Sequence, residues 1–310
     1  MTTALVTGAG GFIGSAVVHA LLDAGWEVRA GYHRTPPPAG TPVLLDLEDD
    51  CTFPRALNGV DALFHFAALV DPRAPAPALF RVNAAATGAL WSAAREAKVG
   101  HALYCSTVAV YGLLAKRTGR IDECVPPRPV EAYGRSKLEG ERLAVGLPTV
   151  IIRPAAVLGP GERTALGAAL RGAALNRLAL AGSLANGAFS FVHVDDLARA
   201  AVHLVDRGHV GVYNVALEPP VTFDAAAAAY VGALKRSDRS HWRARSVARA
   251  SQLARQLPWV VAALKRLGGA GWLFAVGTPG MEMAYSARLL QDTGFEFQWA
   301  KLEDALLTCL

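Results

Sequence analysis

A tyrosine and a lysine four residues apart, Tyr133 and Lys137, have the spacing that most directly suggests chemistry. They lie at the start of a predicted helix, where a separation of four places two side chains on one face. A free phenol has a pKa of about 10, so a tyrosine that exchanges protons near neutral pH needs a nearby cation to stabilise its phenolate. Lys137 can be that cation, and the pair predicts proton transfer with a substrate oxygen. The alternative is a surface helix with an unrelated tyrosine and lysine.

A glycine-rich turn near the start of the chain could hold a dinucleotide. Gly8, Gly11 and Gly14 directly follow the first predicted strand and open a helix. The first permits a tight turn, the second lets the backbone approach a pyrophosphate, and the third permits close helix packing, while the helix N-terminus attracts negative charge. Such turns also serve ordinary strand-to-helix packing, but this placement in a β-α-β pattern predicts cofactor binding.

The end of the second predicted strand indicates which dinucleotide binds. An acidic side chain there would hydrogen-bond the ribose of NAD, and the segment 28–34 supplies none. Arg34, with His33 beside it, could instead pair with the extra phosphate of NADP. The sequence therefore favours NADP(H) over NAD(H), with a solvated Arg34 as the alternative.

The elements that must position these residues alternate along the first half of the chain. Short β-rich runs and longer helical patterns predict an α/β fold, a doubly wound parallel sheet with helices on both faces. The predicted strands are Ala4–Thr7, Val28–Tyr32, Val43–Leu45, Ala62–Phe66, His101–Cys105 and Thr149–Arg153. The predicted helices are Ile13–Ala24, Phe80–Ala97 and Ala132–Val145, and the proline-rich segments 35–40 and Asp71–Pro77 are predicted loops.

The second half is expected to be divided between the sheet and the substrate. After Pro154 the pattern loosens, but Phe189–Leu204 and Val212–Val215 resemble a return to the sheet. We therefore expect a dinucleotide-binding domain of residues 1–155 with 186–217 returning to it, and a smaller, discontinuous C-terminal substrate-binding region of residues 156–185 and 218–310.

Composition narrows the possible partners. The 310 residues are 52% hydrophobic and 18% charged, enough apolar content for a large core. The net charge of +5 comes from scattered residues, so no nucleic-acid partner is expected. The four cysteines have neither metal-ligand spacing nor the density of a secreted scaffold, and the N-terminus lacks the pattern of a signal peptide. Both point to reduced thiols in a cytoplasmic protein.

Two other segments could suggest a membrane or a metal. Pro258–Val276 is apolar but carries Lys265 and Arg266, so we expect a folded or substrate-covering segment, with shallow membrane contact as the alternative and no transmembrane segment. His193 and Asp195-Asp196 are explained by a structural histidine and helix-start carboxylates, and no metal is predicted.

The Tyr133/Lys137 pair, the segment Tyr104–Gly112 and the glycine turn together resemble the extended short-chain dehydrogenases/reductases, and the match runs through most of the chain. The resemblance implies a Rossmann domain and is closest to the dihydroflavonol-reductase and 3β-hydroxysteroid-dehydrogenase branch. Motifs that agree in order are Asp46-Leu47, His65–Ala68, Val82–Ala84, Arg153-Pro154, Val157–Gly161, Phe191–Asp196, Ser286–Leu290 and Gly294-Phe295.

The resemblance also implies roles. Thr107 would hydrogen-bond the substrate oxygen, with Ser106 as its competitor; Tyr133 would exchange the proton; Lys137 would lower the tyrosine pKa and hold the nicotinamide ribose. Asn83 corresponds to the family's helix asparagine and completes the catalytic set. The implied cofactor-binding residues are Gly8, Gly11, Phe12, Ile13, Gly14, His33, Arg34, Asp46, Leu47, Ala67, Ala68, Tyr133, Lys137, Pro154 and Val157.

The substrate is predicted less directly. Nucleotide-sugar enzymes of the family use an asparagine and an arginine where this chain has Ala156 and Phe189. Losing both would leave buried diphosphate oxygens without partners. The segments expected around the site are apolar: Leu113-Leu114, Leu178–Leu184, Trp259 and Trp272–Phe274. A hydrophobic ketone, aldehyde or secondary alcohol suits them.

Three hypotheses follow. The first is an NADP(H)-dependent oxidoreductase acting on a hydrophobic small molecule; the second is a nucleotide-sugar epimerase or dehydratase; the third is a non-catalytic cofactor-sensing protein. Tyr133 and Lys137 disfavour the third, because a sensor has no use for proton transfer. A homodimer is a further expectation, formed through the alanine-rich segments Asn83–Ala97 and Ala132–Val145.

Overall fold

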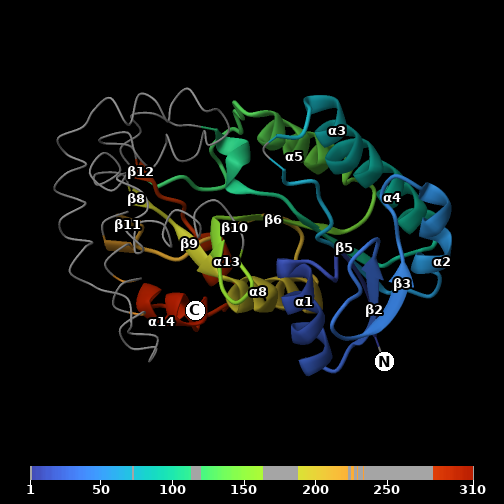
Figure 1. Cartoon of the computed structure of the whole chain (residues 1–310), viewed down its shortest axis with the longest axis horizontal. Helices are drawn as coiled ribbons and strands as arrows, with labels where there is room; N and C mark the ends of the chain where they lie inside the picture. Colours follow the sequence, from blue (N-terminus) through green and yellow to red (C-terminus); the bar gives the residue numbers. More distant parts are fainter. Residues whose placement is uncertain are drawn as a thin grey trace.

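A seven-stranded parallel sheet is the centre of the computed structural model of the chain (Figure 1). The structure describes residues 2–71, 73–112, 120–162, 188–222, 225, 226, 229, 233 and 282–309. The strand order is β10-β6-β5-β4-β1-β2-β3, and every neighbouring pair is parallel. The strands are β1 Thr3–Thr7, β2 Glu27–Tyr32, β3 Thr41–Leu44, β4 Ala62–His65, β5 His101–Cys105, β6 Thr149–Pro154 and β10 Gly211–Val215.

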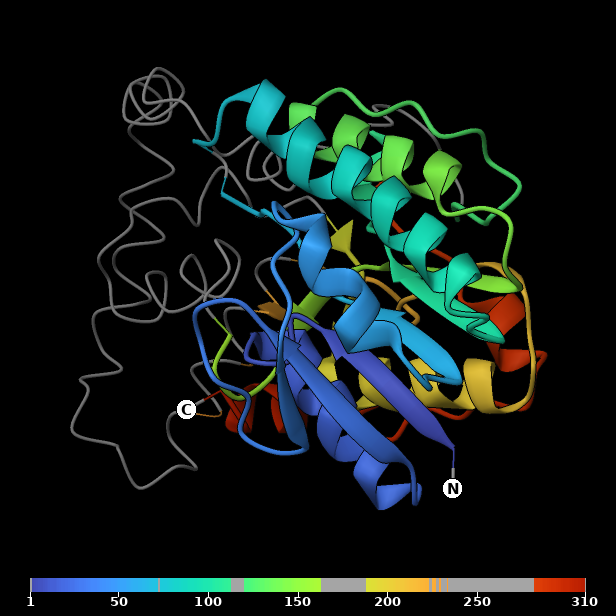
Figure 2. The same cartoon turned by 90° about the vertical axis from the view of Figure 1, so that its right-hand side faces the viewer.

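Helices cover both faces of this sheet. Figures 1 and 2 show α3, α4 and α5 over one face and α1 and α8 over the other. Their bounds are α1 Phe12–Asp23, α2 Phe53–Leu57, α3 Ala76–Phe80, the π-helical turn Arg81–Ala85, α4 Ala86–Glu96, α5 Ala132–Leu143 and α8 Val194–Asp206. The expected doubly wound α/β fold is confirmed.

Successive side chains of a strand point to opposite faces of the sheet, and in β1 the apolar side chains on both faces are buried by helices. In β1, Ala4 and Val6 join the core beneath α1 and α8, whereas Leu5 joins the core that includes Leu90 and Trp91 of α4. All three β1 side chains are fully buried. A strand that is apolar on both faces is typical of a parallel sheet between two helical layers.

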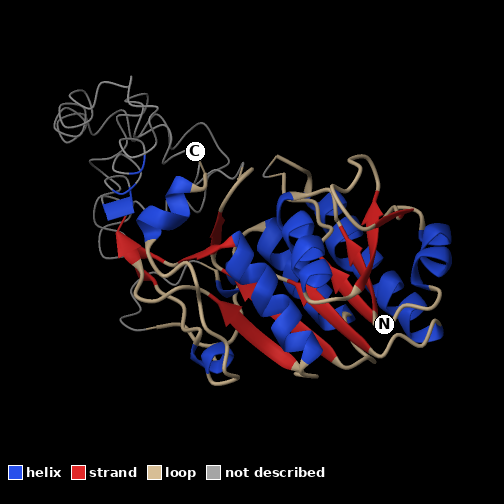
Figure 3. Cartoon of the chain, turned by 90° about the horizontal axis from the view of Figure 1, so that it is seen from below, coloured by secondary structure: helices blue, strands red, loops and turns tan. Residues whose placement is uncertain are grey.

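Smaller elements lie beyond the sheet and build a further core around Leu158, Phe189 and Leu302. Strand β7 Ala156–Leu158 pairs with β9 Phe191–His193, and β8 Ala188–Phe189 pairs with β11 Val221–Thr222 and β12 Glu282–Met283. The remaining described elements are the 3-10 helices Asp50–Thr52 and Val108–Tyr111 and the helices α13 Arg288–Gln291 and α14 Leu302–Leu307. Figure 3 shows this region at one end of the sheet.

The structure corrects the predicted helices in one layer. The single helix predicted over Phe80–Ala97 begins earlier, at Ala76, and contains the π-helical turn Arg81–Ala85. Prolines had marked the segment before it as a loop, but Pro77 stands in the first turn of α3, where its missing N–H costs nothing. Helix α2 was not among the predicted helices; Pro54 stands in its first turn.

Some expectations are not tested by these elements. Strand β10 extends the sheet beside β6, as expected of residues 186–217, but the division into domains stays a prediction. The apolar segments Leu113-Leu114, Leu178–Leu184 and Pro258–Val276 lie outside the described residues. Among the helices that are described, none has both the length and the apolar content to cross a membrane.

Candidate active site

The carboxyl ends of the parallel strands carry most of the predicted cofactor residues. The glycine turn follows β1, His33-Arg34 follows β2, Asp46-Leu47 comes soon after β3, Ala67-Ala68 comes soon after β4, Thr107 comes soon after β5, and Pro154 ends β6. Parallel strands end at the same edge of a sheet, and this edge is where doubly wound folds bind ligands. The topology therefore brings residues from six strands to one rim.

The glycine turn fits a pyrophosphate. Gly8 has φ of 70°, and a Cβ there would lie 2.8 Å from the backbone nitrogen of Ala67. A Cβ on Gly14 would overlap the Gly8 carbonyl oxygen. Helix α1 follows at once from its N-cap Gly11, with no side chain of the described residues capping it and no acidic residue in its first turn. The first-turn amides of Phe12, Ile13 and Gly14 are therefore available to an anion.

The loop after β2 lies against the same turn. A Cβ on Gly10 would overlap the carbonyl oxygen of Thr35, so the residues next to Thr35 are held close to the glycine turn. Arg34 is exposed there, and His33 Nε2 lies 3.3 Å from Asp46 Oδ2. Two of the predicted cofactor-binding residues thus contact each other.

A hydrogen-bonded chain that the sequence did not indicate joins the ends of β1 and β4 to the π-helical turn and α4. The Thr7 hydroxyl oxygen accepts the backbone N–H of Phe66 and of Ala67, at 3.2 and 3.1 Å. Its proton is then directed to His65 Nδ1 at 2.7 Å, His65 Nε2 lies 3.1 Å from the Thr87 hydroxyl, and that hydroxyl donates to the Asn83 carbonyl at 3.0 Å. The sequence placed Thr7 at the end of a strand and His65 in a motif. Their structural role follows only from these hydrogen-bond partners.

The His65 imidazole is held neutral. Burial, and secondarily the charge of Lys137, lowers its pKa from 6.5 to about 3. The unfolded chain therefore binds a proton at His65 between these values that the native protein does not bind, so native stability is lost as pH falls from about 6.5 towards 3.

We expect His65→Gln to weaken this dependence. Its free energy of unfolding should fall less steeply below pH 6.5, by up to about 1.4 kcal/mol per pH unit, because the differential protonation is removed. Urea titrations between pH 4 and 7 measure the slopes, and His19→Gln, a change at an exposed histidine, is the control. Parallel slopes in the wild type and His65→Gln contradict the assignment.

Helix α5 places Tyr133 and Lys137 on adjacent turns of one face. Lys137 is buried, with its Nζ 4.1 Å from the centre of the Tyr104 ring. Burial lowers the pKa of Lys137 to about 8, against the opposing effects of Cys105 and Glu141. Burial raises the pKa of Tyr133, and the neighbouring Cys105 adds to that rise. The site therefore combines a protonated phenol with an ammonium that titrates close to neutral pH.

The structure distinguishes the two candidate hydroxyls. The Ser106 hydroxyl is buried and donates to Glu141 Oε1 at 2.5 Å. Thr107 is partly exposed, and its hydroxyl oxygen accepts the Ala109 N–H at 3.2 Å, which leaves the hydroxyl proton free of that bond. Thr107 is thus the hydroxyl better able to donate to a substrate oxygen.

The Asn83 side chain contacts the supports of the site. Its amide nitrogen donates to the Leu69 carbonyl at 2.9 Å and to the Ser136 hydroxyl at 3.1 Å, and its oxygen accepts the Leu69 N–H at 2.7 Å. These bonds join the π-helical turn to α5 and to the loop after β4. Asn83 is therefore placed to position α5, and none of these three bonds involves the Tyr133 hydroxyl or the Lys137 ammonium.

Two polar clusters have structural roles. Buried His193 stacks on Trp299 at 4.1 Å and bonds Thr308 at 2.9 Å, while buried Asp196 accepts the backbone N–H of Gln298 and of Trp299, each at 2.9 Å. Both tie the C-terminal segment to the start of α8, as expected of structural groups.

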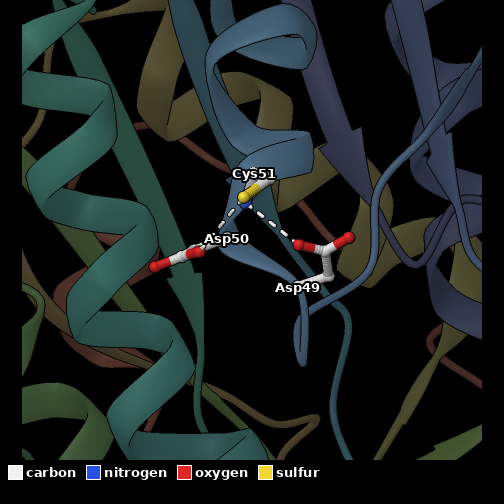
Figure 4. Close-up of side chains that lie close together, drawn as sticks. All are labelled: Asp49, Asp50 and Cys51. Atoms are coloured by element: carbon white, nitrogen blue, oxygen red, sulfur yellow. Dashed lines mark hydrogen bonds between the residues drawn. The ribbon is translucent and has the colours of Figure 1, made fainter.

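The second cluster is exposed and consists of Asp49, Asp50 and Cys51 (Figure 4). Asp49 accepts the Cys51 N–H at 3.2 Å and so caps the 3-10 helix Asp50–Thr52. Asp49, together with Asp50, raises the pKa of the Cys51 thiol, and a thiol must lose its proton to become a metal ligand. The capping bond accounts for this cluster.

Comparison with known proteins decides the class of this rim site. The model of the NAD dependent epimerase/dehydratase family matches residues 4–216. The chain belongs to this family. The resemblance to extended short-chain dehydrogenases/reductases is thereby confirmed.

Relatives in the family have varied names. Sterol demethylase protein B of Methylococcus capsulatus is 32% identical over 221 residues, 66% of this chain and 66% of that protein. The UDP-glucose 4-epimerase of Azospirillum brasilense is 36% identical over 179 residues, 52% of this chain and 51% of that protein. The chain spans about half to two thirds of the length of the curated relatives it matches.

A solved structure of the family resembles the whole chain. MoeE5 in complex with UDP-glucose and NAD is 25% identical with a TM-score of 0.74, over 99% of this chain and 97% of that chain. The chain thus shares its fold with a protein solved with NAD bound, and it belongs to a family described as NAD dependent.

Proposed function

We propose that this protein is an NADP(H)-dependent oxidoreductase that reduces a ketone or aldehyde of a hydrophobic small molecule, or oxidises the corresponding secondary alcohol. The observation that carries this proposal is the Tyr133/Lys137 pair on α5, with the Lys137 ammonium buried over Tyr104. Membership of the NAD dependent epimerase/dehydratase family also supports it.

The chain's residues have distinct tasks in this proposal. The glycine turn and the N-terminus of α1 hold the pyrophosphate, and NADPH, when bound, supplies the hydride that reaches the substrate carbon. The Thr107 hydroxyl donates a hydrogen bond to the substrate oxygen, and Tyr133 gives that oxygen its proton. Lys137 stabilises the phenolate that remains, which then takes a proton from solvent. Oxidation of the alcohol runs through the same groups in reverse.

The proposal of a hydrophobic substrate is based on Phe189 and Ala156, two positions where the sequence departs from what we expect of nucleotide-sugar enzymes. Phe189, where we expected nucleotide-sugar enzymes to have an arginine, is buried in the core with Leu158 and Phe191. Ala156 has only a methyl side chain, where we expected nucleotide-sugar enzymes to have the amide of an asparagine. The relative named a sterol demethylase protein also supports an apolar substrate.

A nucleotide-sugar epimerase is the second candidate, supported by the Azospirillum relative and by MoeE5 with UDP-glucose. Following cofactor absorbance with panels of hydrophobic ketones, secondary alcohols and nucleotide sugars separates the two. We expect turnover among the ketones and alcohols; turnover confined to the sugars would overturn the proposal. Cofactor binding without turnover, equally tight in Tyr133→Phe, would favour a cofactor-sensing protein.

We expect Arg34→Ala to weaken NADPH binding about 10- to 100-fold and NADH binding less than twofold, because a charge-assisted bond to the extra phosphate is worth about 1.5–3 kcal/mol. Fluorescence titration of each dinucleotide measures both constants. Arg55→Ala, a change at an exposed arginine on α2, is the control. Tighter binding of NADH than NADPH in the wild type, unaffected by Arg34→Ala, contradicts the preference.

A homodimer through α4 and α5 is also part of this proposal. Leu143, near the end of α5, and Val145, just beyond it, are exposed apolar residues on that side of the sheet. Light scattering at micromolar concentration tests it, and a monomer discards it.

A further inference from the structure

A buried carboxylate lies on α5 beyond the proton-transfer pair. Glu141 follows Lys137 by four residues and Tyr133 by eight, so the three side chains share one face of the helix. Its side chain is 7% exposed. Its oxygens accept the Ser106 hydroxyl at 2.5 Å and the Arg153 Nε and Nη2 at 2.9 and 2.6 Å. The carboxylate thus bonds to the residue that follows β5 and to Arg153 of β6.

Arg153 of β6 extends this network away from the helix. Its Nη1 donates to the Tyr111 hydroxyl at 2.9 Å, and that hydroxyl donates to Asn214 Oδ1 of β10, also at 2.9 Å. The guanidinium carbon lies 4.9 Å from the centre of the Tyr111 ring. The network therefore joins α5, the end of β5, β6, the 3-10 helix after Thr107 and β10.

The stability of the fold does not by itself explain why a buried ion pair stands at this position. A buried ion pair pays a large desolvation cost, and apolar replacements of similar volume are often as stable. Here the pair contacts the residue directly before Thr107 and lies one helical turn from Lys137. The proposed reaction depends on both Thr107 and Lys137.

The charges around Lys137 show what Glu141 contributes. The groups that contact it or interact with its charge are Glu141 from α5, Tyr104 and Cys105 from β5, and His65 from β4. The pKa of Cys105 is raised to about 11 and that of His65 lowered to about 3, so both are neutral near pH 7. Of these groups, Glu141 is the one with a negative charge at that pH, although its partner Arg153 offsets part of it.

We propose that Glu141, clamped by Arg153, is a positioning residue of the proton-transfer site, which fixes the Ser106-Thr107 strand end through a hydrogen bond and supports the Lys137 ammonium through its charge. The inference rests on the proposed function for its kinetic consequence, but its electrostatic half can be measured without turnover. Removing the charge should release the Lys137 proton at lower pH.

The test is Glu141→Gln, examined with NADP⁺ bound. NMR titration of lysine labelled with carbon-13 at the ε position, assigned through Lys137→Arg, should show the Lys137 midpoint shifted down by about 1 pH unit. In the active protein, kcat should fall about 10- to 100-fold, and the alkaline limb of its pH profile should move down by the same amount as the midpoint. Glu139→Gln is the matched control, since Glu139 lies on the same helix in an exposed pair with Arg142.

The outcomes separate this inference from the proposed function. An unshifted Lys137 midpoint in folded Glu141→Gln overturns the inference, whether or not the wild type turns over any substrate. If the wild type shows no turnover but the midpoint shifts, the proposed function fails and the electrostatic inference stands. If Glu141→Gln does not fold, Ser106→Ala replaces it: kcat should fall about tenfold with the Lys137 midpoint unchanged, and wild-type kcat would overturn the positioning role.

Discussion

Replacing Tyr133 with phenylalanine is expected to lower kcat by about 10²–10⁴-fold, the range that a positioned general acid contributes. The change removes the hydroxyl that we propose gives a proton to the substrate oxygen and leaves the ring, which is partly buried on α5. NADPH affinity should change less than threefold, because the glycine turn and the start of α1 remain intact. Steady-state kinetics with the best ketone from the panel, and fluorescence titration of NADPH, measure the two effects.

The matched control for this experiment is Tyr213→Phe. The Tyr213 hydroxyl donates to the Val210 carbonyl at 3.2 Å beside the edge strand β10, away from the proton-transfer pair. Its loss should leave kcat unchanged. Tyr133→Phe with more than a tenth of wild-type kcat would show that the proton comes from another group.

Replacing Arg153 with methionine is expected to lower the free energy of unfolding by about 3–5 kcal/mol, the usual cost of leaving one partner of a buried ion pair alone. The Arg153 and Glu141 side chains are 5% and 7% exposed, so the carboxylate would remain in the interior with the Ser106 hydroxyl as its remaining hydrogen-bond partner among the described residues. The Tyr111 hydroxyl would also lose a donor. Urea unfolding at pH 7 measures the loss.

Two further variants show whether the loss comes from the stranded charge. Arg153→Met combined with Glu141→Gln should recover part of the stability, since no buried charge remains. Arg142→Met, which breaks the exposed pair with Glu139, should cost less than about 1 kcal/mol. A double variant less stable than Arg153→Met by the full cost of Glu141→Gln would show that the two residues act independently.

Local patterns predicted the fold well. The β-rich runs and helical periods lie within short segments, and the strand β5 has the predicted bounds His101–Cys105. The glycine turn and the Tyr133/Lys137 pair also depend on neighbours within a few residues, so their spacing alone was enough to propose a role for them.

Contacts between distant segments could not be predicted in this way. Ser106 and Glu141 are 35 residues apart, and Tyr111 and Asn214 are 103 apart. Nothing in the sequence around Arg153 shows that its guanidinium is directed to Glu141. The Asn83 side chain in the π-helical turn similarly bonds to Leu69 and Ser136, which lie outside that turn and far from it in the sequence.

A crystal structure of the protein with NADP⁺ tests the central arrangement most directly. We expect the pyrophosphate at the N-terminus of α1, with the Tyr133 hydroxyl and the Lys137 ammonium both directed towards the nicotinamide and its ribose. A nicotinamide bound far from a Tyr133 oxygen that points into bulk solvent would contradict the proposed proton transfer.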